Sequence, residues 1–220
     1  NVGRPGTGVN PLRGQNNVQG ACDMGAYPNV YSGYQKCEDD ATRKRMEELW
    51  GVTGLPSEYG ATLVEQINQC GDPIRAMYIF ALNPVVSYPD SNHVMRSLEK
   101  LDFLVVQDIF MTETAKYADV ILPGVSFAEK DGTFTSGERR VNRVRKAVEP
   151  PGEARPDWEI FVDLAHRLGL KGFDFNSPED IWNDVRRVTP SMAGISYERI
   201  EKPESLHWPC PTVEHPGTPI

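Results

Sequence analysis

The sequence lacks the features that would place it in a membrane or on nucleic acid. No apolar segment approaches the roughly 20 residues of a membrane-spanning helix, and the first residues lack the charged and then apolar pattern of a secretory signal. We therefore expect no membrane insertion and a cytoplasmic location. A basic surplus is also missing, because 23 Lys and Arg stand against 31 Asp and Glu, for a formal net charge of -8. Nucleic acid is not an expected partner, since phosphate binding needs a basic face.

Patterns that bind metals or activate nucleophiles are missing too. The four cysteines have no CxxC spacing, and the four histidines have neither HxxxH nor HxxE spacing. We therefore predict free thiols, and no zinc site, iron–sulfur cluster or other metal site within this chain. The glycine motifs of ordinary NAD-binding folds and of P-loops do not occur either. No serine stands in a nucleophile elbow, so a hydrolase triad is not expected.

What is present begins with a long stretch of glycines, prolines and amides over residues 1–34, without hydrophobic periodicity. This composition predicts a long loop, and long loops in compact domains are usually functional. The chain has no starting Met and opens inside this glycine-rich stretch, so we expect it to begin within a longer protein. Residues 201–220 are rich in proline and are predicted to form an extended connector.

The middle of the chain alternates apolar runs with amphipathic segments. Continuous apolar runs over 76–80, 103–106 and 120–123 predict buried parallel strands. Amphipathic segments with capping residues predict helices over 40–50, 62–70, 91–101, 157–168 and 178–185, with Asp157 as a helix cap and a hairpin or irregular segment over 133–143.

The predicted fold class is α/β, an open, mostly parallel, doubly wound (Rossmann-like) sheet with a long N-terminal loop and an extended C-terminal connector. We expect three parts: a loop segment at 1–34, an α/β domain at 35–200 and the connector at 201–220.

Polar residues follow each of the three predicted strands. The loops at 81–87, 107–112 and 123–126 carry amide, carboxylate or hydroxyl groups. Ligands of open parallel sheets bind beyond the carboxyl ends of the strands, so these loops indicate a nucleotide-like ligand. Polar residues at strand ends also cap helices and make turns, and this structural alternative stays open.

A specific resemblance is carried by residues 8–25, Gly-Val-Asn-Pro-Leu-Arg-Gly-Gln-Asn-Asn-Val-Gln-Gly-Ala-Cys-Asp-Met-Gly. This run resembles the signature of soluble formate dehydrogenase catalytic subunits. The stretch 106–114 also matches that family, and 118–123, 129–134 and 138–140 match the wider molybdopterin oxidoreductase family. The resemblance extends over the chain to about Cys210.

The resemblance implies a larger enzyme that oxidises formate to carbon dioxide. In that family, two molybdopterin guanine dinucleotides chelate molybdenum or tungsten, and an N-terminal domain carries a 4Fe-4S cluster. Cysteine or selenocysteine binds the metal beside a histidine. None of these ligand-bearing parts is recognisable in this sequence, so the chain resembles a cofactor-binding central region that is inactive alone. Formate and electron-transfer iron–sulfur or flavin subunits are the implied partners.

The same resemblance implies roles for individual residues. Arg13 matches the arginine beside the metal, where its guanidinium binds the formate carboxylate. Positions that match cofactor contacts are Gly14, Gln15, Asn83, Ser87, Gln107, Gly124 and Asp157. Asn83 departs from the aspartate of some relatives. The structural alternatives are that Arg13 only orders its loop and that Asp157 only caps a helix.

Two other functions remain as alternatives. One is a different molybdopterin oxidoreductase, such as a nitrate reductase or a related subunit of a respiratory complex. The other is a non-catalytic scaffold that kept the fold and lost the cofactor. The run Arg13-Gly14-Gln15-Asn16-Asn17 argues against the first alternative, and the intact Arg13 and Gln15 argue against the second.

Overall fold

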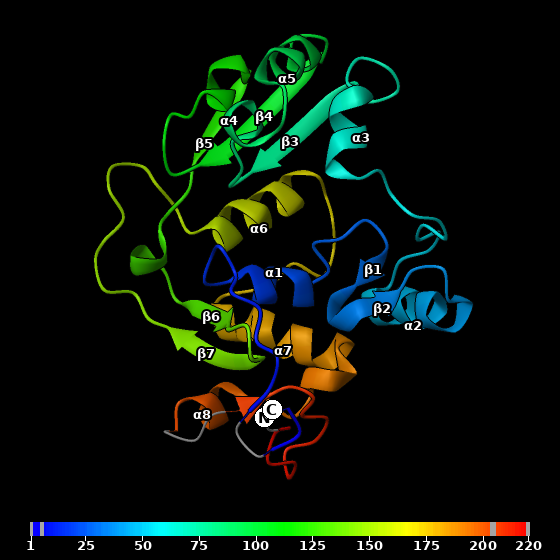
Figure 1. Cartoon of the computed structure of the whole chain (residues 1–220), viewed down its shortest axis with the longest axis vertical. Coiled ribbons are helices and arrows are strands. Elements are labelled where there is room, and N and C mark those ends of the chain that lie inside the picture. The colour runs from blue at the N-terminus through cyan, green and yellow to red at the C-terminus, as the bar shows by residue number, and fades with distance from the viewer. Residues whose placement is uncertain (1, 5–6, 203–205, 219–220) are drawn as a thin grey trace. The chain divides into compact units, whose positions relative to one another are not determined.

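The computed structural model describes residues 2–4, 7–202 and 206–218, and its chain forms two compact units (Figure 1). Unit 1 consists of Asn1–Gly60, Asp131–Arg145 and Gly169–Ile220. Unit 2 consists of Ala61–Lys130 and Lys146–Leu168. None of the helices in the described ranges is long and apolar enough to cross a membrane.

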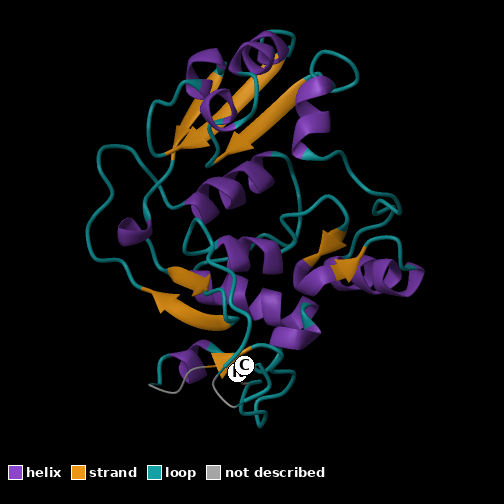
Figure 2. Ribbon diagram, viewed as in Figure 1, coloured by secondary structure: helices purple, strands orange, loops and turns teal. Residues whose placement is uncertain are grey.

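Unit 2 is built on a parallel sheet of the strands β3 (Ala76–Phe80), β4 (Phe103–Asp108) and β5 (Val120–Pro123), in that order (Figure 2). The register pairs Ile79 with Val106 and Val106 with Ile121. The strands form where the sequence has continuous apolar runs, but the prediction of buried strands holds best at the centre of the sheet. Leu104 and Val106 of β4 are buried, whereas Val120 and Ile121 of the edge strand β5 are 38% and 40% exposed.

Helices cover both faces of this sheet. On one face, a buried cluster joins Val94 and Leu98 to Leu104 and Val106 of β4. On the other face, the Phe161 ring lies 5.8 Å from the ring of Tyr78 and 5.3 Å from that of Phe80, centroid to centroid. The helical elements of unit 2 are α3 (Leu63–Asn68), α4 (Pro84–Ser87), α5 (Ser91–Leu98), η2 (Thr114–Tyr117), η3 (Phe127–Glu129) and α6 (Asp157–Arg167).

Capping side chains begin several of these helices, and one predicted cap is wrong. Thr62 and Glu65 form a capping box at α3, and the Asp90 carboxylate accepts a hydrogen bond from the His93 amide at α5. Asp157 does not cap α6: it is the first helical residue, and Pro156 holds the cap position without a side-chain bond. The Asp157 carboxylate is turned to other side chains, described below.

Unit 1 combines two small antiparallel sheets with helices around a second core. The described strands are β1 (Val30–Tyr31) with β2 (Gln35–Lys36), and β6 (Gly132–Thr135) with β7 (Arg140–Val144) and β8 (Leu206–His207). The helical elements are α1 (Val18–Asp23), η1 (Ser32–Tyr34), α2 (Asp40–Trp50), α7 (Pro178–Val188), η4 (Pro190–Met192) and α8 (Tyr197–Ile200). The core contains Trp182, Met192, Ile195, Leu206 and Cys210.

Polar contacts hold α1 inside the stretch predicted to be a loop. The Asn17 side-chain oxygen accepts a hydrogen bond from the Thr135 amide of β6 at 3.0 Å. A Cβ atom at Gly20 would lie 2.2 Å from that oxygen, so only glycine leaves room for it. The asparagine and glycine of this stretch therefore serve the packing of α1.

The α/β class with an open parallel sheet is confirmed, but the compact units divide the chain at other positions than 34/35 and 200/201. Residues 1–34 contain α1 and β1, and Leu206 and Cys210 of the predicted connector are buried. Residues 203–205 and 219–220 of that connector lie outside the described residues. The difference arises because distant partners order both ends, and local periodicity does not report such partners. The functional roles expected for the three segments stay predictions.

We predict that Leu104→Ala destabilises unit 2 by about 2 to 5 kcal/mol, because it leaves a cavity beneath a side chain that is 1% exposed. The control is Leu168→Ala, which removes the same atoms from a side chain that is 65% exposed and should cost less than about 0.5 kcal/mol. Urea unfolding followed by circular dichroism measures both. Equal losses would contradict the assignment of this core.

Candidate functional site

The buried amide of Gln107 is the centre of a polar cluster at the carboxyl end of β4. Gln107 is 0% exposed. Its Nε2 donates a hydrogen bond to Asp157 Oδ1 at 2.8 Å, and its Oε1 accepts one from the Tyr78 hydroxyl. Both ends of the amide are therefore satisfied by protein groups, as burial of a polar side chain requires.

Asp157 links this amide to a cation at the start of α6. Its Oδ2 accepts a hydrogen bond from Lys130 Nζ at 2.5 Å, and the two side chains are 15% and 27% exposed. The positive end of the helix dipole favours a carboxylate at this position. Lys130 was not among the predicted site residues, although it lies in the family-like stretch 129–134. The resemblance over that stretch is the sequence feature that could have pointed to Lys130.

Gly124 completes the cluster by leaving space for the carboxylate. It is buried after β5, and a Cβ atom there would lie 2.7 Å from Asp157 Oδ1. Any larger residue would push the carboxylate from its place beside Gln107. The structure thus brings together Gln107, Gly124 and Asp157, which lie far apart in the sequence.

Asn83 and Ser87 lie in a separate cluster around α4. Asn83 Oδ1 accepts hydrogen bonds from the Thr114 hydroxyl at 2.7 Å and the Thr114 amide at 3.3 Å, and Nδ2 donates to Glu113 Oε2 at 2.8 Å. The Ser87 hydroxyl donates to the Asn83 carbonyl at 2.8 Å and is exposed. The hydrogen bond from Asn83 lowers the pKa of the Glu113 carboxyl below its ordinary value.

In unit 1, Arg13 lies in an open cavity of about 390 Å³ that Gly14 and Gln15 also line. Arg13 is exposed, and its Nη2 donates a hydrogen bond to Gln19 Oε1 at 3.2 Å. The three predicted residues of this loop therefore border one space. A guanidinium at its wall can bind a small anion through charge-assisted hydrogen bonds.

Behind Arg13 lies a buried network that the sequence patterns did not reveal. Asp23 is 0% exposed, and its carboxylate accepts hydrogen bonds from Gln19 Nε2 at 2.7 Å, the Tyr34 hydroxyl at 3.1 Å and Trp208 Nε1 at 2.8 Å. Burial raises the pKa of the Asp23 carboxyl above its ordinary value. Burial and the nearby charge of Asp23 raise the pKa of Tyr34 to about 12.

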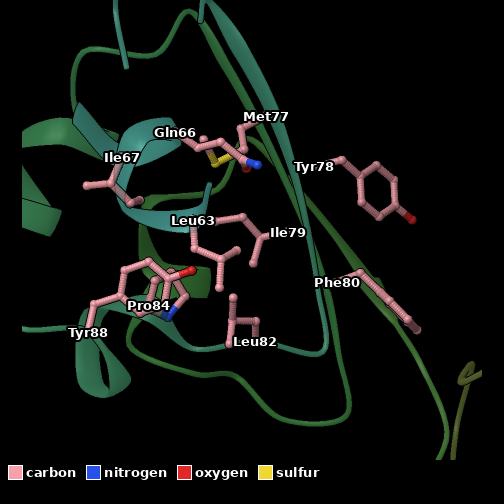
Figure 3. Close-up of a pocket in the computed structure, with 10 residues that line it drawn as sticks. All are labelled: Leu63, Gln66, Ile67, Met77, Tyr78, Ile79, Phe80, Leu82, Pro84 and Tyr88. Atoms are coloured by element: carbon pink, nitrogen blue, oxygen red, sulfur yellow. The ribbon is translucent and has the colours of Figure 1, made fainter. Parts of the chain in front are cut away.

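An apolar pocket of about 200 Å³ lies between β3, α3 and α4 of unit 2 (Figure 3). Met77 and Ile79 face it from β3, whereas Tyr78 and Phe80 point to the opposite side of the strand. None of the predicted site residues lines it. In the part of the chain that the structure describes, no three His, Cys, Asp or Glu side chains are grouped as a metal site.

The fold and these clusters define an α/β protein with polar groups gathered at the carboxyl ends of parallel strands. The molybdopterin oxidoreductase family matches residues 1–167, so the chain belongs to this family. The F420-dependent formate dehydrogenase subunit alpha of Methanocaldococcus jannaschii is 57% identical over 221 residues, which cover 100% of this chain and 32% of that protein. Formate dehydrogenase H of Escherichia coli is 42% identical over 211 residues, covering 96% and 29%.

A solved structure of the same architecture is acetylene hydratase from Pelobacter acetylenicus, with a TM-score of 0.58 and 24% sequence identity. The match covers 86% of this chain and 26% of that chain, and at this identity it shows the fold alone. The chain spans about a third of the length of the first relative and slightly less of the second.

We predict that Asn83→Ala raises the pKa of Glu113 towards its ordinary value, because the amide donor at 2.8 Å is lost. A depressed carboxyl pKa stabilises the fold above the unfolded-state pKa, and this contribution is lost as the pH falls through the folded-state pKa. The stability advantage of the parent chain over the variant should therefore narrow in acid.

A carbon-detected NMR titration of the Glu113 carboxyl measures the pKa, and urea unfolding at several pH values measures the stability difference. The control is Asn92→Ala, at an exposed position of α5, which should leave Glu113 unchanged. An unshifted Glu113 pKa in Asn83→Ala would show that the contact is not formed in solution.

Proposed function

We propose that the chain is the cofactor-binding central region of a formate dehydrogenase alpha subunit. In the complete enzyme it would help to hold molybdopterin guanine dinucleotide with molybdenum or tungsten. The observation that carries the proposal is the loop around Arg13: its sequence has the formate dehydrogenase signature, and its residues border one open cavity. A relative that is 57% identical over the whole of this chain, and is named as a formate dehydrogenase subunit, supports it.

The residues of unit 2 fit a guanine nucleotide. Guanine presents adjacent N–H donors on its base-pairing edge, and a carboxylate accepts from such a pair. Asp157 is partly exposed, held in place by Gln107 and Lys130, and given room by Gly124. A carboxylate has about four lone-pair sites, so these two partners leave capacity for a ligand. Lys130 also brings positive charge for a phosphate.

The residues of unit 1 fit a small carboxylate. The fork of N–H groups on Arg13 suits formate better than a lysine would, because a planar guanidinium can donate two parallel hydrogen bonds. Formate oxidation releases carbon dioxide, a proton and two electrons, and the metal centre, when bound in the complete enzyme, would accept the electrons. In this proposal Arg13 holds the carboxylate and fixes the direction in which its C–H bond points. Electrons would then reach a partner subunit through iron–sulfur centres elsewhere in the enzyme.

We expect GMP to shift the amide NMR signals of residues near Gln107, Gly124 and Asp157 at millimolar concentration, and AMP to shift them less. The reason is that adenine lacks the paired donors that the Asp157 carboxylate accepts. Asp157→Asn should weaken the GMP response, whereas Asp163→Asn, on the same helix, should leave it intact. Equal responses to GMP and AMP, or a full response in Asp157→Asn, would contradict the nucleotide assignment.

Arg13→Lys, introduced into the complete enzyme, is expected to lower formate turnover by about two orders of magnitude, because the charge remains but the two-bond geometry is lost. Metal and guanine dinucleotide content should stay at the parent level, since the unit 2 contacts are untouched. Dye reduction and cofactor analysis on one preparation separate the two effects. Loss of cofactor in proportion to activity would instead make Arg13 a structural loop residue.

A further inference from the structure

The carboxylate of Asp23 accepts hydrogen bonds from three uncharged donors. Gln19 and Tyr34 donate to Oδ1, and Trp208 donates to Oδ2. An ionised carboxylate accepts and never donates, so it suits this position in a way that an amide cannot. Among the described residues no cation donates a hydrogen bond to it, and Arg13 lies one side chain further along.

This arrangement decides which way the Gln19 amide points. Gln19 is 7% exposed, and its NH₂ group donates hydrogen bonds to Asp23 Oδ1 at 2.7 Å and to the Tyr34 hydroxyl at 3.0 Å. The Tyr34 hydroxyl can also donate, so Asp23 is the partner that requires an NH₂ group on this side. Its oxygen is then turned to the opposite side, where it accepts the hydrogen bond from Arg13 at 3.2 Å. If the amide were reversed, its NH₂ group would meet the donors of the guanidinium, and the contact with Arg13 would be lost.

We propose that Asp23 is a positioning residue that acts through Gln19: it sets the orientation of the Gln19 amide and thereby holds the Arg13 guanidinium at the wall of its cavity. The functional role of Arg13 at this wall rests on the proposed function, but the contact between Gln19 and Arg13 can be tested without any cofactor.

The substitution Asp23→Asn tests the polarity of this network. The new amide offers one acceptor and one donor where three donors converge. If its NH₂ group faced Trp208, two donors would oppose each other in a partly buried place, which costs the full desolvation of both. If its oxygen faces Trp208, its NH₂ group faces Gln19, and the Gln19 amide must reverse. The second arrangement is favoured, because Arg13 is exposed and water can replace its lost partner.

The double variant Gln19→Glu with Asp23→Asn restores the polarity. The carboxylate now at position 19 accepts both from the amide at position 23 and from Arg13, while the amide keeps its oxygen for Trp208. Tyr34 serves either arrangement, since a hydroxyl both donates and accepts. The net charge of the network is the same as in the parent chain, but the negative charge has moved from position 23 to position 19, next to Arg13.

The measurement is the side-chain ¹⁵N–¹H signal of Arg13 in the full chain, assigned by its loss in Arg13→Lys. We expect the exchange rate of the Arg13 guanidinium to be about tenfold higher in Asp23→Asn than in the parent chain, and to return to the parent value in the double variant. The control Asp184→Asn removes a surface carboxylate of unit 1 and should change nothing at Arg13. An unchanged Arg13 signal in Asp23→Asn together with a shifted Trp208 indole signal would overturn the proposal.

A second readout in the complete enzyme separates this inference from the proposed function. Asp23→Asn should raise the KM for formate more than it lowers kcat, with cofactor content unchanged, and the double variant should recover the KM. If the Arg13 signal follows the prediction and the parent enzyme has no formate activity, the proposed function fails and the positioning role stands. If the parent enzyme oxidises formate and the KM of Asp23→Asn is unchanged, the positioning role fails.

Discussion

A primary amide without access to water needs a donor and an acceptor from the protein itself, and Gln107 at the end of β4 is in this position. Its oxygen accepts a hydrogen bond from the hydroxyl of Tyr78 on β3, and its NH₂ group donates one to the carboxylate of Asp157 on α6. One side chain thus fixes two strands and a helix at the edge of the sheet. Gly124 and Lys130 serve the same contact: Gly124 leaves room for the Asp157 carboxylate, and Lys130 supplies its counter-charge.

Much of unit 2 was predictable from the sequence, since its elements obey local rules. Continuous apolar runs are typical of strands in parallel sheets, and those at 76–80 and 120–123 form β3 and β5 where strands were expected, although most of the edge strand β5 is exposed. In unit 1, the start of α7 was also predictable, because Ser177 caps the helix before Pro178. α1 was missed because its buried residues are Gln19, Gly20 and Asp23, which have no hydrophobic period.

The residues of the candidate site also differ in whether the sequence could indicate them. Gln107, Gly124 and Asp157 came from the resemblance as cofactor contacts, and the structure brings them together at the ends of strands and the start of a helix. Arg13 came from the resemblance, since no spacing rule points to it. The contact between Asp23 and Trp208 could not be found from any local pattern, because Trp208 lies 185 positions further along the chain and only the folded backbone brings the two together.

This sequence separation has a consequence for the order of events during synthesis. Unit 1 is assembled from three chain segments, and the whole of unit 2 is made between the first and the last of them. Long loops must close before such distant contacts can form, and closure is slow compared with local helix formation. The indole that completes the network behind Arg13 leaves the ribosome only after the whole of unit 2. The side-chain network behind Arg13 therefore stays incomplete while unit 2 is being synthesised.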